Sequence, residues 1–108
     1  MSRRLLAALT AGLLATAGTA AAEPLRVGML LTLSGPPAAL GQQARDGFML
    51  AMDDLGGALG GIEAEVLVED IELRPDVAQT KARALIERDA VDVVVGTIFS
   101  NMLQAIFK

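Results

Sequence analysis

The residue types that carry most enzyme chemistry are missing from this chain, which leaves hydroxyls, amides and carboxylates. Its 108 residues include no histidine and no cysteine. A thiolate nucleophile, an imidazole acid or base, a disulfide and a zinc cluster are therefore excluded, and only carboxylates remain as possible metal ligands. No nucleophile, base and orienting group can be assembled from what is left. We predict no catalytic residue, no metal and no cofactor, and a protein that is not an enzyme.

Two short polar segments are the candidates for binding a ligand. Ser34 and Gly35 open the run Ser-Gly-Pro-Pro and place a hydroxyl and free backbone N–H groups beside a predicted helix start, where anions are favoured. Ser100 and Asn101 precede a further predicted helix and can grip a carboxylate through charge-assisted hydrogen bonds. Each segment also has a structural interpretation, as an ordinary helix entry or a helix cap. The residues alone leave both interpretations open.

Other binding chemistries find little support in the sequence. No glycine-rich phosphate-binding motif is present, and Gly56-Gly57 and Gly60-Gly61 stand between a helix and a strand, the wrong order for such a motif. The chain has a net charge of −4 and three phenylalanines as its only aromatic residues, which argues against nucleic acid as a partner. Asp70 invites comparison with a phospho-acceptor aspartate, but Glu69, Asp70 and Glu72 fit a solvated loop better.

The elements that must position these groups alternate between strands and helices. Apolar runs predict strands over residues 25–33, 64–70 and 91–95, and helical periodicity predicts helices over 38–55 and from Pro75, with a third from Met102. We expect the first helix to bury Ala44, Phe48, Ala51 and Leu55, and the second to bury Ala78, Ala82, Leu85 and Ile86.

This order of elements predicts an α/β fold with a parallel, doubly wound sheet. If the first strand is central and the other two flank it, the direction of winding reverses between the first and third strands. Ligands of such sheets bind outside the carboxyl ends of the strands at that point. The loops there are residues 32–37 and 96–101, so the two polar segments meet at the expected site.

Residues 1–22 are predicted to be a signal peptide. Arg3-Arg4 precede an apolar run over residues 5–17, and Ala20 and Ala22 fit a cleavage site before Glu23, where the acidic residues begin. An uncleaved membrane anchor is the alternative, but the run is shorter than the roughly 20 residues that span a bilayer. The Sec and twin-arginine routes both remain open. We expect a periplasmic product.

Seven short motifs follow one another in the chain. They are Leu33-Ser34-Gly35-Pro36, Leu40-Gly41, Arg45-Asp46-Gly47, Gly60-Gly61-Ile62, Val68-Glu69-Asp70, Val91-Asp92-Val93-Val94-Val95-Gly96 and Phe99-Ser100-Asn101. In order and spacing they resemble the N-terminal lobe of Leu/Ile/Val-type periplasmic binding proteins, the ligand-capture components of ABC importers. The resemblance covers residues 25–108. It implies a type I periplasmic binding fold, of which residues 23–108 form an incomplete N-terminal lobe, and a small-molecule ligand such as a branched-chain amino acid or related carboxylate.

The resemblance also assigns roles to residues. Ser100 stands where the family binds the ligand carboxylate, and Leu40 stands where it often offers an aromatic or apolar wall. Asn101 replaces the serine or other small residue of other members. An ABC permease is the implied partner of the full-length protein. The alternatives are a ligand-sensing domain of the same fold and, less favoured, an exported α/β enzyme. Because the third helix is cut at its beginning, we expect the 108-residue product to be marginally folded or insoluble alone.

Overall fold

The computed structural model describes residue 18 and residues 22–108 of the chain. The signal peptide predicted for residues 1–22 therefore lies almost wholly outside the described residues. Within the described part, no helix is both long enough and apolar enough to cross a membrane.

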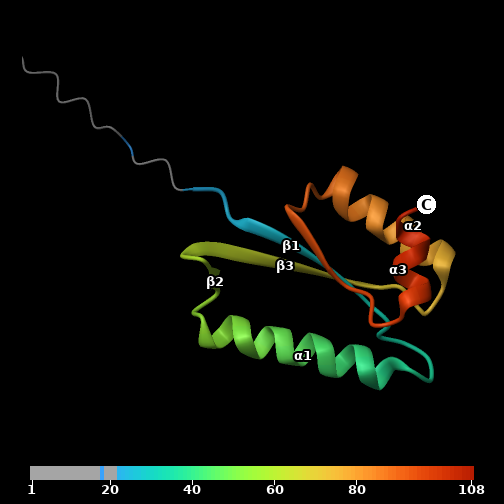
Figure 1. The fold of residues 1–108 in the computed structure, drawn as a ribbon. Coiled ribbons are helices and arrows are strands. Elements are labelled where there is room, and N and C mark those ends of the chain that lie inside the picture. The colour runs from blue at the N-terminus through green and yellow to red at the C-terminus, as the bar shows by residue number, and fades with distance from the viewer. Residues whose placement is uncertain (1–17, 19–21) are drawn as a thin grey trace, which may run out of the picture.

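A four-stranded sheet with the order β2-β3-β1-β4 forms the framework of the molecule (Figure 1). The central strand β1 (Leu25–Leu31) runs parallel to β3 (Ile62–Asp70) on one side and to β4 (Val93–Gly96) on the other. A two-residue strand, β2 (Ala58–Leu59), pairs antiparallel with the start of β3. The predicted parallel sheet is confirmed, and the first strand is central, which the sequence alone left as a condition. The antiparallel β2 was not predicted.

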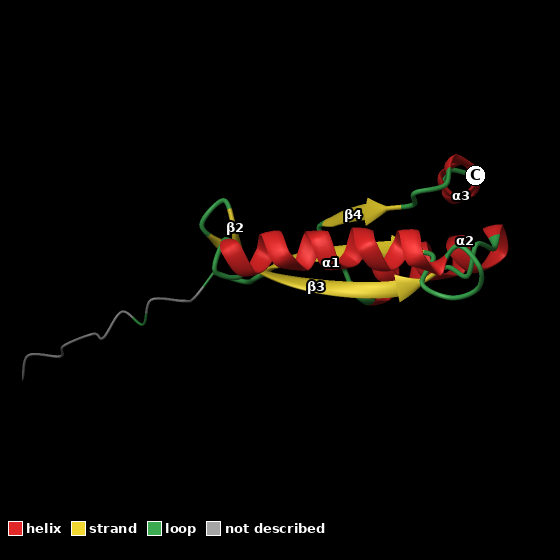
Figure 2. Ribbon diagram, turned by 90° about the horizontal axis from the view of Figure 1, so that it is seen from below, coloured by secondary structure: helices red, strands yellow, loops and turns green. Residues whose placement is uncertain are grey.

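The helices cover both faces of the sheet. Helix α1 (Ala38–Asp54) lies on one face, and α2 (Pro75–Arg83) with α3 (Ser100–Ile106) lies on the other (Figures 1 and 2). One turn of π-helix, η1 (Ala84–Arg88), extends α2. This arrangement follows from right-handed crossovers, because β1 to β3 and β3 to β4 step in opposite directions across the sheet.

The main core lies between the sheet and the α2–α3 layer. Leu30, near the carboxyl end of β1, is fully buried, and the side chains that cluster with it are Ile71, Ala78, Ala82, Leu85 and Met102. Burying one leucine side chain completely contributes about 1.5–3 kcal/mol to stability. The near-continuous apolar character of β1 reflects burial on both faces, since its residues from Val27 to Leu31 are all buried.

The buried side of α1 differs from the predicted stripe. Gly41 and Met52 are the buried residues of this helix and Phe48 is partly buried, whereas Ala44, Ala51 and Leu55 are exposed. The prediction was wrong because it followed the alanines and ignored glycine. Helix α1 turns its glycine toward the sheet, where the backbones approach closely.

The predicted stripe of the second helix is confirmed at Ala78, Ala82 and Leu85, which are all buried. It is wrong at Ile86, which is 56% exposed. The π-helical turn is the reason, because a wider turn changes the angle between successive side chains and leaves Ile86 outside the core.

Strand and helix ends also shift by about two residues. β3 starts at Ile62 because β2 pairs with its first residues, and α3 starts at Ser100 where Met102 was predicted. β4 starts at Val93 where Val91 was predicted, because Val91 instead donates its amide to the Leu85 carbonyl at 3.1 Å.

Candidate ligand-binding site

The carboxyl ends of the three parallel strands bring three loops to one edge of the sheet. We name them the β1 loop (residues 32–37), the β3 loop (residues 71–74) and the β4 loop (residues 97–99). The β1 and β4 loops follow adjacent strands, as the alignment of Leu30 with Gly96 shows. This edge is therefore the point where the winding of the sheet reverses, and it is where ligands of such sheets bind.

The β1 loop is fixed by close contact between Thr32 and α1. A side chain at Gly41 would collide with the Thr32 carbonyl, so only glycine permits this approach of helix to strand. Farther along the loop, the Gly35 carbonyl accepts the Ala38 amide at 3.1 Å and starts α1. Ser34 and Gly35 lie exposed on the rim that results, with Leu40, 49% exposed, one turn into the helix.

The β4 loop is held equally close to β1. Gly96 has φ of +120°, and a Cβ there would collide with the Leu30 carbonyl. Thr97 donates its amide to the same carbonyl at 2.8 Å and adopts φ of +53°, a conformation that costs a β-branched residue energy. Backbone strain of this kind tends to occur at functional sites.

Ser100 is the first residue of α3 and is exposed, as is Asn101. The N-cap position belongs to Phe99, and no side chain caps this helix. The interpretation of Ser100 or Asn101 as a helix cap is therefore wrong. The polar side chains of Ser100 and Asn101 lie at the rim and do not cap the helix.

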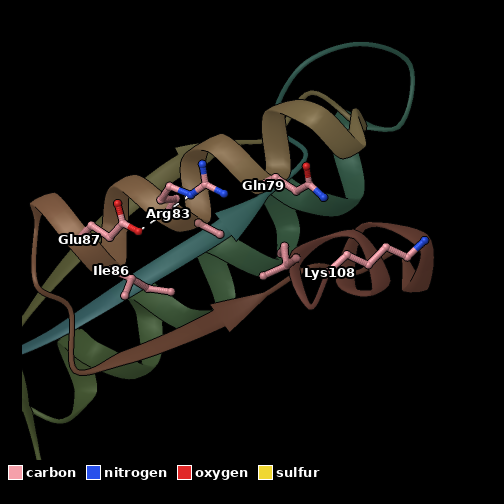
Figure 3. Close-up of a pocket in the computed structure, with 7 residues that line it drawn as sticks. Gln79, Arg83, Ile86, Glu87 and Lys108 are labelled. Atoms are coloured by element: carbon pink, nitrogen blue, oxygen red, sulfur yellow. Dashed lines mark ion pairs between the residues drawn. The ribbon is translucent and has the colours of Figure 1, made fainter.

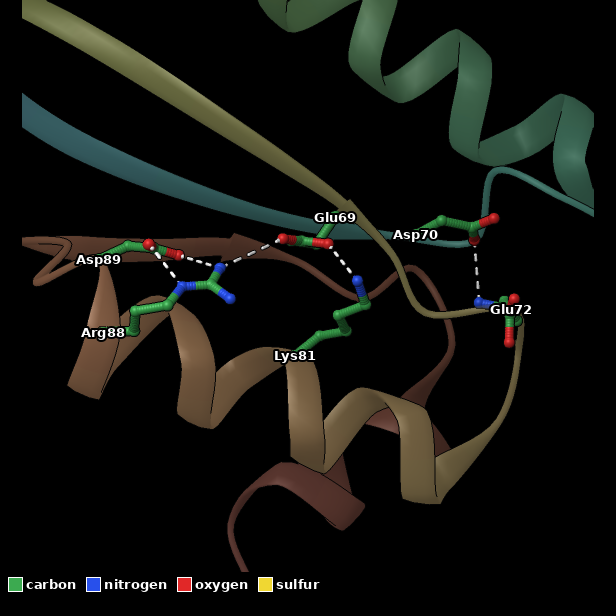
Figure 4. Close-up of polar contacts among 6 residues, drawn as sticks. All are labelled: Glu69, Asp70, Glu72, Lys81, Arg88 and Asp89. Carbon is green, nitrogen blue, oxygen red and sulfur yellow. Dashed lines mark hydrogen bonds and ion pairs between the residues drawn. The ribbon is translucent and has the colours of Figure 1, made fainter.

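The β3 loop is tied to the β1 loop by Asp70, the last residue of β3. Its Oδ1 accepts the Leu33 amide at 2.8 Å. The same oxygen accepts the Glu72 amide at 2.9 Å, the contact that Figure 4 shows. Partial burial raises the pKa of this carboxyl, but hydrogen bonds from Leu33, Ser34 and Glu72 outweigh burial and hold the pKa below its ordinary value. The predicted solvated loop at this position is wrong.

Glu69 also has a structural partner. Its carboxylate accepts a hydrogen bond from Lys81 of α2 at 2.6 Å and lies 3.9 Å from Arg88 of η1, which itself pairs with Asp89 (Figure 4). Hydrogen bonding to Arg88 lowers the pKa of Asp89. These ion pairs attach the helical layer to the end of β3, although exposed pairs contribute only about 0–1 kcal/mol each.

Two hydroxyl groups at this edge are buried without a hydrogen-bond partner among the described residues. They belong to Thr32, which is 2% exposed, and to Thr97. Such groups are rare in folded proteins. The sequence predicted neither the burial of these two hydroxyls nor the hydrogen bonds of Asp70. A threonine or aspartate at the end of a strand has the same local sequence pattern whether or not a distant residue contacts it.

All five predicted site residues therefore lie at one edge of the sheet, in the β1 loop and the first turns of α1 and α3. Two hollows of the described surface contain none of these five residues. One hollow opens between α2 and α3 and is lined by Gln79, Ala82, Arg83, Ile86, Glu87, Ile106 and Lys108 (Figure 3). Among the described residues, no group of three carboxylates is arranged to hold a metal ion.

Comparison with known proteins identifies the family to which this fold belongs. The model of the family described as periplasmic binding protein matches residues 24–107, and the chain belongs to this family. Its members are substrate-binding transport proteins. The fold of the described residues is a partial lobe of a type I periplasmic binding protein.

Particular relatives sharpen the comparison. The chain is 35% identical over 103 residues to the Leu/Ile/Val-binding protein homolog 7 of Brucella suis, covering 94% of this chain and 25% of that protein. Among solved structures, an ABC transporter substrate-binding protein from Sphaerobacter thermophilus is 44% identical, with a TM-score of 0.74. A solute-binding protein from R. palustris, solved with benzoate, is 34% identical with the same TM-score. Each structural match covers 78% of this chain and 23% of the other.

The chain thus spans about a quarter of the length of the relatives that it matches.

Proposed function

We propose that this chain forms part of the N-terminal lobe of a periplasmic solute-binding protein that captures a small carboxylate for an ABC importer. The observation that carries the proposal is the meeting of the β1 and β4 loops at the carboxyl edge of the sheet. Membership of the periplasmic binding protein family supports it. Residues 23–108 would then be an incomplete lobe, exported after cleavage before Glu23, and the full-length protein would deliver its ligand to an ABC permease.

A carboxylate is the group that the named ligands share. The Brucella relative is named for leucine, isoleucine and valine, and the R. palustris protein was solved with benzoate. The amino acids carry an ammonium group and benzoate does not, whereas all four carry a carboxylate beside an apolar body. We therefore assign carboxylate recognition to this lobe, because it is the feature that fits both kinds of relative.

In this proposal the two polar segments divide the work. Ser100 donates its hydroxyl, and Asn101 donates its backbone N–H, to the ligand carboxylate, whereas the next amides of α3 already donate to the Phe99 carbonyl. Asn101, also exposed in that first turn, adjusts the choice of ligand. Ser34 and Gly35 contact the ligand from the β1 loop, and Leu40 contributes an apolar wall. A site that closes between two lobes is an open rim in one lobe alone, which fits the exposure of all five residues.

The test uses a full-length hybrid in which residues 24–107 replace the matching segment of the R. palustris benzoate-binding protein. Benzoate and L-leucine are titrated calorimetrically, with the unaltered host as the positive control for benzoate. We expect the hybrid to bind at least one of the two. A folded hybrid that binds neither, beside a host that binds benzoate, would refute the proposal.

Ser100→Ala in this hybrid should weaken binding about ten- to hundred-fold, because a hydrogen bond to a charged group is worth about 1.5–3 kcal/mol. Ser34→Ala should cost less, because the β1 loop keeps its backbone amides. If Ser34→Ala abolishes binding and Ser100→Ala does not, the carboxylate contact belongs to the β1 loop.

A further inference from the structure

Asp70 connects two loops of the proposed site through a single oxygen atom. Its Oδ1 accepts one amide from the β1 loop, at Leu33, and one from the β3 loop, at Glu72. Figure 4 shows the carboxylate at the end of β3, turned toward the Glu72 amide. A charged acceptor makes hydrogen bonds that are shorter and stronger than those between neutral groups, so this contact fixes both loops relative to β3.

The contact lies beside a strained stretch of backbone. Glu72 and Leu73 both adopt φ of +54°, a left-handed conformation that is costly for residues other than glycine. Between Asp70 and this strained pair, Ile71 is fully buried and donates its amide to the Leu31 carbonyl at 2.9 Å. Asp70 and Ile71 together therefore hold the carboxyl end of β1 to the carboxyl end of β3.

The position of Leu33 is passed on directly to the ligand-binding segment. Ser34 follows Leu33 in the chain, and the Leu33 carbonyl accepts the side-chain amide of Gln42 from α1 at 3.5 Å. Leu33 thus lies between Asp70 on one side and α1 on the other. A shift of Leu33 would move Ser34, Gly35 and the start of α1 together.

We infer that Asp70 is a positioning residue for ligand binding, which holds the β1 loop in the conformation that the ligand requires without contacting the ligand itself. The inference rests on the proposed function and deepens it. Asp70 would act through its hydrogen bonds with Leu33, Ser34 and Glu72, so a neutral side chain that preserves an oxygen at the same place should preserve most of the effect.

Asp92 offers a control for Asp70, because it contacts β1 at the end opposite to the one that Asp70 contacts. Asp92 accepts the Arg26 amide through Oδ2 at 2.8 Å, and its own amide donates to the Arg26 carbonyl at 2.8 Å. Asp92 therefore attaches the amino end of β1 to β4 much as Asp70 attaches its carboxyl end to the β3 loop. The Asp92 carboxylate accepts one backbone amide where the Asp70 carboxylate accepts two, and only Asp70 lies at the proposed site.

The experiment compares Asp70→Ala, Asp70→Asn and Asp92→Ala in the hybrid, with benzoate and L-leucine as the probes. We expect Asp70→Ala to weaken binding about ten-fold, Asp92→Ala to change it by less than about two-fold, and Asp70→Asn to recover most of the loss. Equal losses in Asp70→Ala and Asp92→Ala would overturn the inference, because the effect would then be general destabilisation. An Asn variant as weak as the Ala variant would also overturn it, because the charge itself would then matter.

A second measurement, on the same hybrid without ligand, separates this inference from the proposed function. The amide resonances of Leu33 and Glu72 are followed by NMR as the pH is lowered. Both should move with one common midpoint in the parent, and neither should show that midpoint in Asp70→Asn. Independent titration of the two amides would reject the positioning role even if the hybrid binds its probes. A common midpoint beside a hybrid that binds nothing would uphold the contact and reject the function.

Discussion

Gly41 and Gly47 lie in the same helix, and the structure predicts opposite outcomes for the same substitution at the two positions. A Cβ at Gly41 would collide with the Thr32 carbonyl and crowd the Leu33 side chain. The carbonyl belongs to buried backbone and cannot rotate away, so α1 must retreat from the sheet. A Cβ at Gly47 meets nothing within 4 Å.

The magnitudes follow from these surroundings. Replacing glycine by alanine inside a helix normally stabilises a protein by about 0.5–1 kcal/mol, and Gly47→Ala should show this gain in full. Gly41→Ala receives the same gain but loses about 1–3 kcal/mol or more to overpacking, since the retreat also loosens Phe48 and Met52. We expect a net loss for Gly41→Ala and a difference of at least about 1 kcal/mol between the variants.

Urea unfolding followed by far-UV circular dichroism is the appropriate assay, because the chain has no tryptophan or tyrosine for fluorescence. Measurement at about 15 °C places the protein near the usual maximum of its stability curve. If Gly41→Ala alone leaves too little folded protein, the substitution is made on the Gly47→Ala background. Equal gains at both positions would refute the close packing of α1 on Thr32.

Other predictions concern pH, export and solubility. Because the folded state lowers the pKa of Asp70, its stabilising effect is present above the ordinary value of 3.8 and is lost as the pH falls below it, so the parent should lose more stability than Asp70→Asn between about pH 4 and pH 2 in acid titrations. N-terminal sequencing of periplasmic material should begin at Glu23, whereas Arg3-Arg4 retained in a membrane pellet would contradict cleavage. The 108-residue chain should melt broadly or self-associate in light scattering, because Val93, Leu103 and Phe107 are 42%, 44% and 81% exposed; a sharp melt of a monomer would contradict this.

The site residues differ in how far sequence could locate them. Ser34 lies in the loop after one apolar strand and Ser100 lies just after the loop that follows another, so both loops could be predicted, and the parallel sheet places them at one edge. The role of Asp70 could not be predicted, since its partner Leu33 lies 37 residues away and any acidic residue at a strand end has the same local pattern.

The sequence by itself determined the alternation of strands and helices, because apolar periodicity records how each element is buried. It also left few arrangements of the parallel sheet, because crossover handedness is fixed. The tertiary structure decided that β1 is central and so brought the β1 and β4 loops together. Only the tertiary structure decided which side of α1 faces the sheet. The contact of Gly41 with Thr32 sets the rotation of the helix, and glycine contributes nothing to a hydrophobic pattern. The tertiary structure likewise decided that Asp70 is bound rather than solvated, because hydrogen bonds between distant residues leave no periodic trace in either segment.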